Sequence, residues 1–279
     1  MGGLRKGENM EHRNLANLKV PVVGMGTSRT FDVSSDSDIA VRREIINSCV
    51  TSGVTFIDSS PMYGESERVV GLSLHGQRHS FQLATKVWCT GREQGIVQID
   101  RSFQLFQTDH IDVFQVHNLV DWRTHLPALE RLKEEGRVGV VGITHYITSA
   151  YPEMMEIMRT GRIGAVQVPY NLWERDCESR LLPLAEEMGI GVIVMRPLGR
   201  GELVTGLKHQ PDLAPLAGHG IHTWAQALLA WILSDHRVSV VIPASSRPER
   251  IVENAAAGQC GPLPQELWAH VSREAERCL

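Results

Sequence analysis

The segments IDVFQVHN (111–118), LPALERLKEEG (126–136) and VGVVGITHY (138–146) follow one another along the chain and decide its fold class. The first and third are nearly continuous apolar runs of strand length, a pattern typical of parallel strands that are buried on both faces. The middle segment has helical periodicity and ends at Gly136, a suitable C-cap. Together they predict a strand–helix–strand unit with parallel strands.

The same unit recurs along the whole chain. Six further strand-length apolar runs are present: VPVVGMGT (20–27), VTFIDSS (54–60), FQLATKVW (81–88), GAVQVPYN (164–171), GVIVMRPL (191–198) and VSVVIPAS (238–245). Helical patterns lie between them, among them residues 38–52 and 179–189, and a last helix is expected at 264–277. Eight such units predict an α/β fold, a single-domain (β/α)8 TIM barrel over residues 1–279, although an open doubly wound sheet has the same pattern.

Composition argues against several functional classes. With 42% hydrophobic and 22% charged residues and no apolar run near the roughly 20 residues of a membrane-spanning helix, the chain is expected not to enter a membrane. A net charge of -4 without a Lys/Arg block disfavours nucleic acid. Five scattered cysteines, no H-E-x-x-H pair and no secretory leader at the start predict a reducing, cytoplasmic setting without a metal site.

One connection is much longer than the others. Residues 199–220, GRGELVTGLKHQPDLAPLAGHG, are rich in Gly and Pro and follow the seventh predicted strand. Connections of about 20 residues in a compact domain are often lids or binding loops. The segment is therefore interpreted as a loop that covers a ligand, with a surface insertion as the alternative.

Polar side chains stand where three consecutive predicted strands end. Asp58 ends the second strand, Lys86 lies near the end of the third, and His117 lies near the end of the fourth. The carboxyl ends of neighbouring parallel strands lie roughly 5 Å apart on one rim, which is where barrel enzymes carry out their chemistry. Tyr63, on the loop after Asp58, is expected to fold over the same point.

These residue types suit acid–base chemistry. A buried lysine keeps its charge only beside an acid, and Asp58 is placed to supply one. The ammonium of Lys86 would stabilise the tyrosinate of Tyr63, whose ordinary pKa is about 10, and would lower that pKa. His117 could hold a substrate oxygen. Each residue alone has a purely structural explanation, but the combination is typical of active sites.

These segments resemble the signatures of the aldo-keto reductase family. The likeness is carried by GVTFIDSSPMYGESERVVG (53–71), LATKVW (83–88) and VFQVHN (113–118), and it extends from GMGT (24–27) to IPASSRPERIVEN (242–254). It implies a (β/α)8 barrel, NADPH as hydride donor, and reversible reduction of aldehydes or ketones. By position it implies that Tyr63 donates the proton and His117 orients the carbonyl. Lys86 would tune the pKa of Tyr63, with Asp58 as its partner.

The resemblance also implies a cofactor site, with several departures from the common pattern. Gln167 stands at the position that binds the nicotinamide amide, but Thr144 and His145 replace the frequent Ser-Asn pair, and Met195 replaces a stacking tyrosine. Pro248 starts a helix whose N-terminus suits a phosphate, and nearby arginines favour NADPH over NADH. The predicted cofactor-binding residues are Gly26, Thr27, Asp58, Thr144, His145, Gln167, Met195, Arg196, Leu198, Gly199, Arg200, Ser245, Ser246, Arg247, Arg250, Glu253 and Asn254.

The expected substrate is a small molecule with a carbonyl group. The predicted pocket wall consists of Met25, Met62, Trp88, Trp122, Tyr146 and Trp173, which suit an apolar or cyclic carbonyl, although loop packing needs the same residue types. Little chain follows the eighth predicted helix, as in bacterial-type members with short C-terminal loops, and this implies an open site. The protein is expected to be a monomer or a weak homo-oligomer.

Two other functions fit the same residues. A redox-sensing regulatory subunit would bind NADPH with little catalysis, although the complete set of four catalytic positions argues against it. A barrel aldolase would use Lys86 to form a Schiff base, which requires a neutral amine. Asp58 is expected to keep that amine charged, so the aldolase is the less favoured of the two.

Overall fold

Eight parallel strands form the wall of a barrel in the computed structural model, which describes residues 10–279. Each strand pairs with the next, and parallel bridges from Val23 to Val241 and from Gly26 to Ala244 join the first strand to the last. The barrel is therefore closed, as predicted, and the open doubly wound sheet is ruled out. Its strands are β3 (Met25–Gly26), β4 (Phe56–Asp58), β5 (Gln82–Val87), β6 (Ile111–His117), β7 (Val138–Thr144), β8 (Ala165–Pro169), β9 (Gly191–Met195) and β10 (Val240–Val241). Residues 1–9 of the predicted domain lie outside the described residues.

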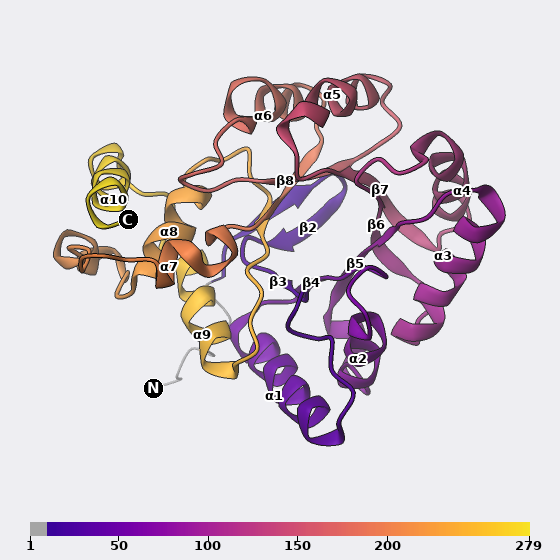
Figure 1. Cartoon of the computed structure of the whole chain (residues 1–279), viewed down its shortest axis with the longest axis horizontal. Helices are drawn as coiled ribbons and strands as arrows, with labels where there is room; N and C mark the ends of the chain where they lie inside the picture. The colour runs from indigo at the N-terminus through magenta and orange to yellow at the C-terminus, as the bar shows by residue number, and fades with distance from the viewer. Residues whose placement is uncertain (1–9) are drawn as a thin grey trace, which may run out of the picture.

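Helices surround this wall (Figure 1). They are α1 (Asp36–Ser52), α2 (Ser66–Ser73), α3 (Arg92–Phe106), α4 (Trp122–Glu134), α5 (Tyr151–Arg159), α6 (Cys177–Glu187), α7 (Glu202–Thr205), α8 (Trp224–Leu233), α9 (Pro248–Ala256) and α10 (Gln265–Cys278). Helix α1 stops because Gly53 adopts a left-handed conformation (φ 74°), and its N–H reaches the carbonyls of Cys49 and Val50. Pro248 starts α9, as predicted.

A hairpin that was not predicted closes one end of the barrel. Strands β1 (His12–Leu15) and β2 (Leu18–Pro21) pair antiparallel, and Leu15 and Val20 are completely buried. They pack on the barrel interior, formed by Phe56, Ala84, Val113, Val140, Ala165, Ile193, Val240 and Ile242. Gly191 permits the approach, because a Cβ there would lie 2.6 Å from the Cα of Leu15. The predicted strand 20–27 is therefore wrong as a single element: it is divided between the hairpin and β3.

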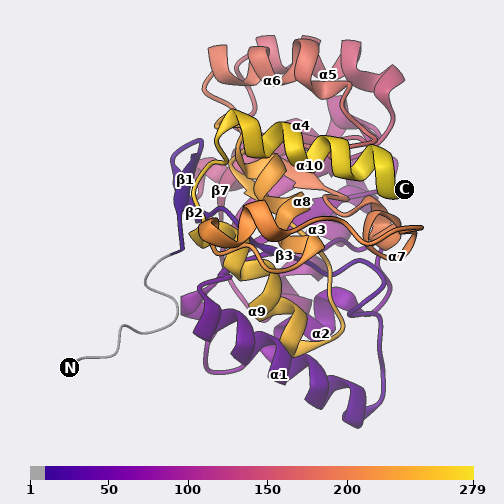
Figure 2. The ribbon, with the colours of Figure 1, turned by 90° about the vertical axis from the view of Figure 1, so that its left-hand side faces the viewer.

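The hairpin determines which end of the barrel can bind a ligand. Figure 1 shows β2 across the middle of the ring of strands, and Figure 2 shows the hairpin and α7 at opposite ends of the barrel. Helix α7 follows the carboxyl end of β9. The strand ends that carry Asp58 and His117 therefore belong to the end that the hairpin leaves uncovered.

The long connection 199–220 is folded rather than irregular. It contains the short 3₁₀ helices η3 (Gly199–Gly201) and η4 (Ala214–His219) as well as α7. Residues 208–212 are attached to α10: Asp212 N–H donates to Glu274 at 2.6 Å, and Lys208 N–H donates to the Cys278 carbonyl at 2.7 Å. Residues 199–205, which form η3 and α7, are the part of the connection that follows β9 directly along the chain.

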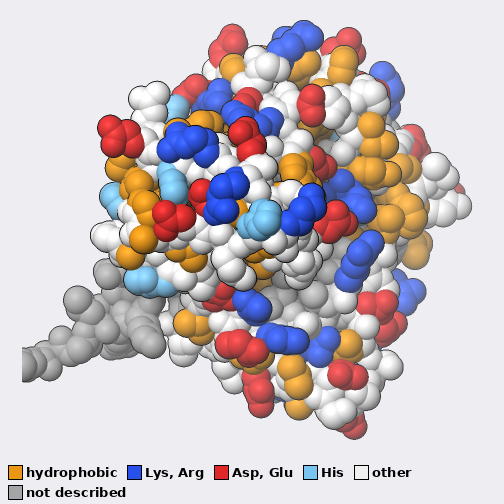
Figure 3. Space-filling model, turned by 60° about the vertical axis from the view of Figure 1, so that its left-hand side comes forward, with side chains coloured by type: hydrophobic (Ala, Val, Ile, Leu, Met, Phe, Trp, Pro, Cys, Tyr) orange, Lys and Arg blue, Asp and Glu red, His pale blue; other side chains and the backbone are white. Residues whose placement is uncertain are grey.

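The outer surface carries mixed charge. On the face that Figure 3 shows, side chains of both signs are interspersed. Among residues 10–279, no helix is long and apolar enough to cross a bilayer, and no group of three or more His, Cys, Asp or Glu side chains is placed to hold a metal ion. Neither finding indicates a function. The main candidate site is therefore at the carboxyl ends of the barrel strands, where Asp58 and His117 lie.

Candidate active site

A buried ion pair joins β4 to β5 at the uncovered end of the barrel. The Lys86 ammonium donates to both carboxylate oxygens of Asp58 at 2.8 Å and to the Ser59 carbonyl at 2.6 Å. Lys86 is 1% exposed and Asp58 is 2% exposed. The pair lies together because Asp58 is level with Ala84 in the parallel ladder, so the side chain of Lys86, two residues further along β5, reaches back to it.

The surroundings keep this pair charged. Burial lowers the pKa of Lys86, but the Asp58 carboxylate, then Tyr63 and the hydrogen bond that Lys86 donates to Asp58 raise it more, so the pKa lies above its ordinary value. Burial also raises the pKa of Asp58, against the opposing effects of Lys86, Gln167 and Gln115. Contact of the ammonium with both carboxylate oxygens fits the ammonium–carboxylate form.

Two glutamines lie next to the carboxylate of Asp58. Gln115 donates to Gln167 at 2.9 Å, and each glutamine lies 3.4 Å from one oxygen of Asp58. The structure therefore brings Gln167 to the predicted catalytic cluster, whereas Gln115 was not predicted. A signal for it exists in the sequence: a glutamine interrupts the apolar run of β6 two residues before His117, and alternate residues of a strand share one face.

Tyr63 is placed by a tight turn after β4. Its N–H donates to the Ser60 carbonyl at 3.0 Å, and its ring centroid lies 5.4 Å from the Lys86 ammonium. The ring of His117 meets it edge-on at a centroid distance of 6.2 Å. The four predicted catalytic side chains thus lie in one cluster.

Burial acts on the pKa of Tyr63 more strongly than the nearby charge. Burial raises this pKa, Lys86 lowers it, Asp58 raises it and Arg196 lowers it, and the pKa is raised overall. The prediction considered only the charge of Lys86, which does lower this pKa, and left out desolvation of the phenolate, which raises it more. Lys86 reduces the cost of losing the proton, while the phenol stays protonated at neutral pH.

His117 is a neutral imidazole. Burial, followed by the charge of Lys86 and the presence of His145, lowers its pKa to about 3. Its Nδ1 lies 3.0 Å from the Ser60 hydroxyl, and the Trp88 ring lies 6.3 Å away between centroids. An uncharged imidazole beside a lysine can hold a carbonyl oxygen by a hydrogen bond.

The nicotinamide end of the predicted cofactor site contains a polar atom without a partner. The Thr144 hydroxyl is fully buried, and it has no hydrogen-bond partner among the described residues. Thr144 is level with both His117 and Gln167 in the sheet. An amide such as that of nicotinamide could satisfy this hydroxyl, so these residues fit the cofactor.

Two further predicted cofactor-binding residues, Thr27 and Gly26, lie next to β4 and β10. The N–H and the hydroxyl of Thr27 both donate to the Asp58 carbonyl at 3.0 Å. Gly26 packs so closely that a Cβ would lie 2.8 Å from the Ile242 carbonyl.

Two other predicted cofactor-binding residues, His145 and Arg196, already have partners within the protein. Nδ1 of His145 accepts from Ile147 N–H at 3.0 Å, and the His145 ring stacks on Tyr146. The Arg196 guanidinium lies 4.8 Å from the centre of the Tyr146 ring and 3.4 Å from Glu174. Met195 is half-buried and Arg200 is exposed. Arg196 thus lies against Tyr146 after the end of β9.

The predicted phosphate-binding residues gather at the start of α9. Ser245 accepts from Arg247 N–H at 3.1 Å, and Arg250 pairs with Glu253 at 2.5 Å. Ser246 and Arg247 are exposed, whereas Asn254 is buried. The N-terminus of this helix therefore lies beside the exposed cationic side chains of Arg247 and Arg250, which suits an anionic group.

Large apolar side chains lie exposed on the loops of the predicted pocket wall. The exposed fractions are 46% for Met62, 40% for Trp88, 41% for Tyr146 and 53% for Trp173. Trp122 is half-buried, and its indole donates to Glu153 at 2.8 Å. The placement of Met25 in this wall is wrong: the side chain is completely buried and its sulfur lies 3.7 Å from the Cys49 thiol of α1. Met25 therefore faces the helix layer.

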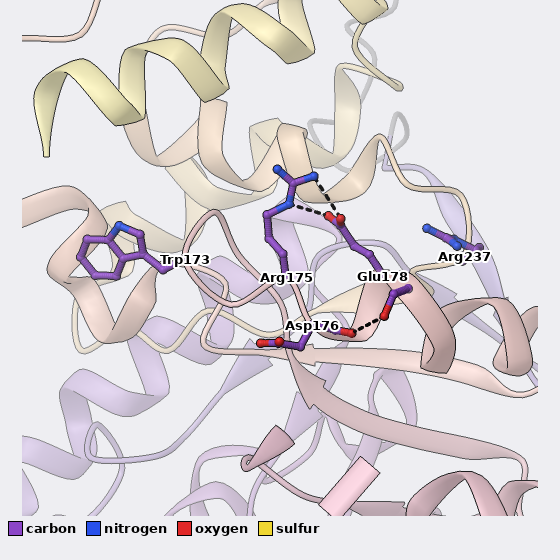
Figure 4. Close-up of a pocket in the computed structure, with 6 residues that line it drawn as sticks. Trp173, Arg175, Asp176, Glu178 and Arg237 are labelled. Carbon is purple, nitrogen blue, oxygen red and sulfur yellow. Dashed lines mark hydrogen bonds and ion pairs between the residues drawn. The ribbon is translucent and has the colours of Figure 1, made fainter. Parts of the chain in front are cut away.

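A surface hollow of about 680 Å³ lies around the start of α6 (Figure 4). It is lined by Trp173, Arg175, Asp176, Glu178, Ser179 and Arg237, and by none of the four predicted catalytic residues. Its two arginines already have partners, because Arg175 pairs with Glu178 at 2.9 Å and Arg237 pairs with Asp235 at 2.6 Å. Asp58 and Lys86 do not line this hollow.

Comparison with known proteins identifies the family of this chain. The model of the aldo/keto reductase family matches residues 22–275. Methylglyoxal reductase YeaE of Escherichia coli K12 is 28% identical over 247 residues, covering 86% of this chain and 86% of that protein. An aldo/keto reductase of Klebsiella pneumoniae, solved in complex with NADP and acetate, is 26% identical with a TM-score of 0.80, covering 97% of this chain and 95% of that one. A complex with NADPH, also from Klebsiella pneumoniae, matches equally well. Since the family match spans most of the sequence, this chain belongs to the aldo/keto reductase family of oxidoreductases.

Proposed function

We propose that this protein reduces the carbonyl group of a small aldehyde or ketone with NADPH, and that Tyr63 is the proton donor. The observation that carries the proposal is the Lys86 ammonium, which contacts both oxygens of Asp58 at 2.8 Å and lies 5.4 Å from the Tyr63 ring. A buried cation fixed between an acid and a phenol assists proton transfer from that phenol.

Each residue has a defined part in the reaction. NADPH, when bound, supplies the hydride that is added to the carbonyl carbon. The Tyr63 hydroxyl donates its proton to the carbonyl oxygen, and Lys86 stabilises the phenolate that remains. Asp58 keeps Lys86 charged, and neutral His117 holds the carbonyl oxygen in place.

The cofactor assignment rests on both ends of the site. We expect Thr144 and Gln167 to bind the carboxamide; the buried Thr144 hydroxyl without a partner, level with Gln167 in the sheet, supports this. The exposed Ser246 and Arg247 at the start of α9 suit the 2'-phosphate of NADPH, a group that NADH lacks. Solved relatives from Klebsiella pneumoniae hold NADP and NADPH. Residues 199–205 are proposed to cover the bound cofactor.

The substrate class follows from the barrel mouth. The exposed side chains of Met62, Trp88, Tyr146 and Trp173 favour an apolar or cyclic carbonyl compound. A relative is named methylglyoxal reductase, so a small dicarbonyl aldehyde belongs on the test panel.

Oxidation of NADPH across a panel of aldehydes, ketones, quinones and sugars tests the function. We expect turnover of several aldehydes or ketones, and weaker turnover when NADH replaces NADPH. Absence of turnover on the entire panel, from a protein that binds NADPH, would contradict the proposal and favour the regulatory subunit.

A further inference from the structure

Ser60 joins the loop of Tyr63 to the ring of His117. Its carbonyl accepts Tyr63 N–H at 3.0 Å, and its hydroxyl oxygen accepts Met62 N–H at 3.2 Å. The same hydroxyl lies 3.0 Å from Nδ1 of His117. Ser60 is completely buried, so water does not compete for these bonds.

The number of available protons determines which side chain is the donor in the hydrogen bond between Ser60 and His117. A serine hydroxyl has one proton to donate and two lone pairs, and the Met62 N–H occupies one lone pair. Within the described part of the chain, Nδ1 of His117 is the acceptor that faces the Ser60 hydroxyl. If Nδ1 carried a proton instead, the buried serine proton would have no acceptor, which is unfavourable.

A neutral imidazole carries a single ring proton. His117 is neutral across the ordinary pH range because its pKa is lowered to about 3. If Nδ1 accepts the serine proton, the ring proton must be on Nε2. Nε2–H then becomes a hydrogen-bond donor, which a carbonyl oxygen requires.

We propose that Ser60 is a positioning residue that holds His117 as the Nε2–H tautomer and fixes its ring relative to the turn carrying Tyr63. The consequence for catalysis rests on the proposed function, but the tautomer does not. The serine would thereby align two groups on one carbonyl oxygen: the Tyr63 hydroxyl that protonates it and the His117 N–H that orients it.

The tautomer can be measured directly. In ¹⁵N NMR of ring-labelled histidine, the signals of His117 are assigned by their loss in His117→Gln. We expect Nε2 protonated and Nδ1 unprotonated in the wild-type protein, and a loss of this preference in Ser60→Ala. A protonated Nδ1 in the wild type, or unchanged His117 signals in Ser60→Ala, would overturn the proposal. The wild-type spectrum suffices if Ser60→Ala does not fold.

Ser59→Ala is the matched control. Ser59 is equally buried, but its hydroxyl contacts Thr27 at 2.9 Å and Ser66 at 3.2 Å instead of a histidine. We expect the His117 signals to stay unchanged in this variant. Equal changes in both variants would show a general packing effect and contradict a specific role of Ser60.

Kinetics supply a second readout. Loss of carbonyl alignment in Ser60→Ala should raise KM for the carbonyl substrate on the order of tenfold while the Kd for NADPH stays unchanged. An unchanged KM would contradict the positioning role. If no carbonyl compound is reduced by the wild type, the proposed function fails, while the NMR result still decides the tautomer.

Discussion

Lys86 keeps a positive charge where the barrel excludes water. Its ammonium is surrounded by two oxygens of Asp58 and the Ser59 carbonyl, all within 2.8 Å. Removing one partner of a buried ion pair leaves the other charge without compensation. We therefore expect the stability of the barrel and the proposed catalysis to depend on the same contact.

Asp58→Asn tests this dependence with little change in shape. We expect unfolding in urea to require about 3 kcal/mol less free energy and kcat to fall by at least about a hundredfold, because Lys86 loses its counter-charge. Asp109→Asn, at an exposed position, is the control and should change stability by no more than about 0.5 kcal/mol. A stability equal to that of the wild type would show that Lys86 does not need Asp58.

His117 makes stability depend on pH in a definite direction. Its pKa falls from 6.5 in the unfolded chain to about 3 in the folded protein, so only the unfolded chain binds the proton between these values. Stability should therefore decline as pH falls below about 6.5, by up to about 1.4 kcal/mol per pH unit. Thermal unfolding of His117→Gln should show a shallower acid decline. Identical pH profiles would contradict a buried neutral His117.

The sequence predicted which side chains meet, but not all of their neighbours. Asp58, Lys86 and His117 could be grouped because the ends of consecutive parallel strands share one rim. Ser60 and Gln115 were missed because their importance comes from hydrogen bonds that depend on side-chain geometry. Met25 was misplaced because, in so short a strand, the facing of a side chain cannot be determined from alternation alone.

At the scale of elements, α10 holds the long connection in place. Glu274 accepts from Asp212 N–H at 2.6 Å, and its pKa is lowered to about 2, first by its hydrogen bond with Arg277. His270 also contacts the Asp212 carbonyl at 2.8 Å. The segment that was predicted as a covering loop is thus attached to a helix far from it in sequence, which periodicity along the chain could not reveal.

Glu274→Ala tests this attachment. We expect faster hydrogen exchange over residues 207–216 and a Kd for NADPH raised about threefold, because a loosened connection must be ordered again when the cofactor binds. Glu276→Ala, exposed on the same helix, should change neither quantity. Unchanged exchange in Glu274→Ala would mean that this contact does not anchor the connection.

At the scale of the whole molecule, the hairpin and α7 lie at opposite ends of the barrel (Figure 2), and the candidate active site belongs to the end away from the hairpin. The alternation of strands and helices predicted the closed barrel because both faces of parallel strands must be covered. It did not predict the hairpin, because VPVV (20–23) is one apolar run although Val20 fills the barrel end and Val23 belongs to the barrel seam. Two different burial environments produced one sequence pattern.

Leu15→Ala tests whether the hairpin end of the barrel contributes to stability without affecting the candidate site at the other end. Leu15 is completely buried against Gly191, so its truncation should cost about 3 kcal/mol in the free energy of unfolding. Under conditions where the variant is folded, kcat and KM should remain close to wild-type values because the site is at the other end. Leu18→Ala, which truncates a half-buried residue of the same hairpin, should cost less. A large loss of activity in folded Leu15→Ala would contradict this separation.

The central claim is that Tyr63 gives its proton to the substrate beside the charged Lys86. The most direct test is Tyr63→Phe, with NADPH binding followed by quenching of cofactor fluorescence and with turnover measured on the best carbonyl substrate. We predict that the Kd for NADPH stays within about twofold of the wild-type value while kcat falls by at least about a thousandfold. Turnover that persists at the wild-type rate in Tyr63→Phe would contradict the account.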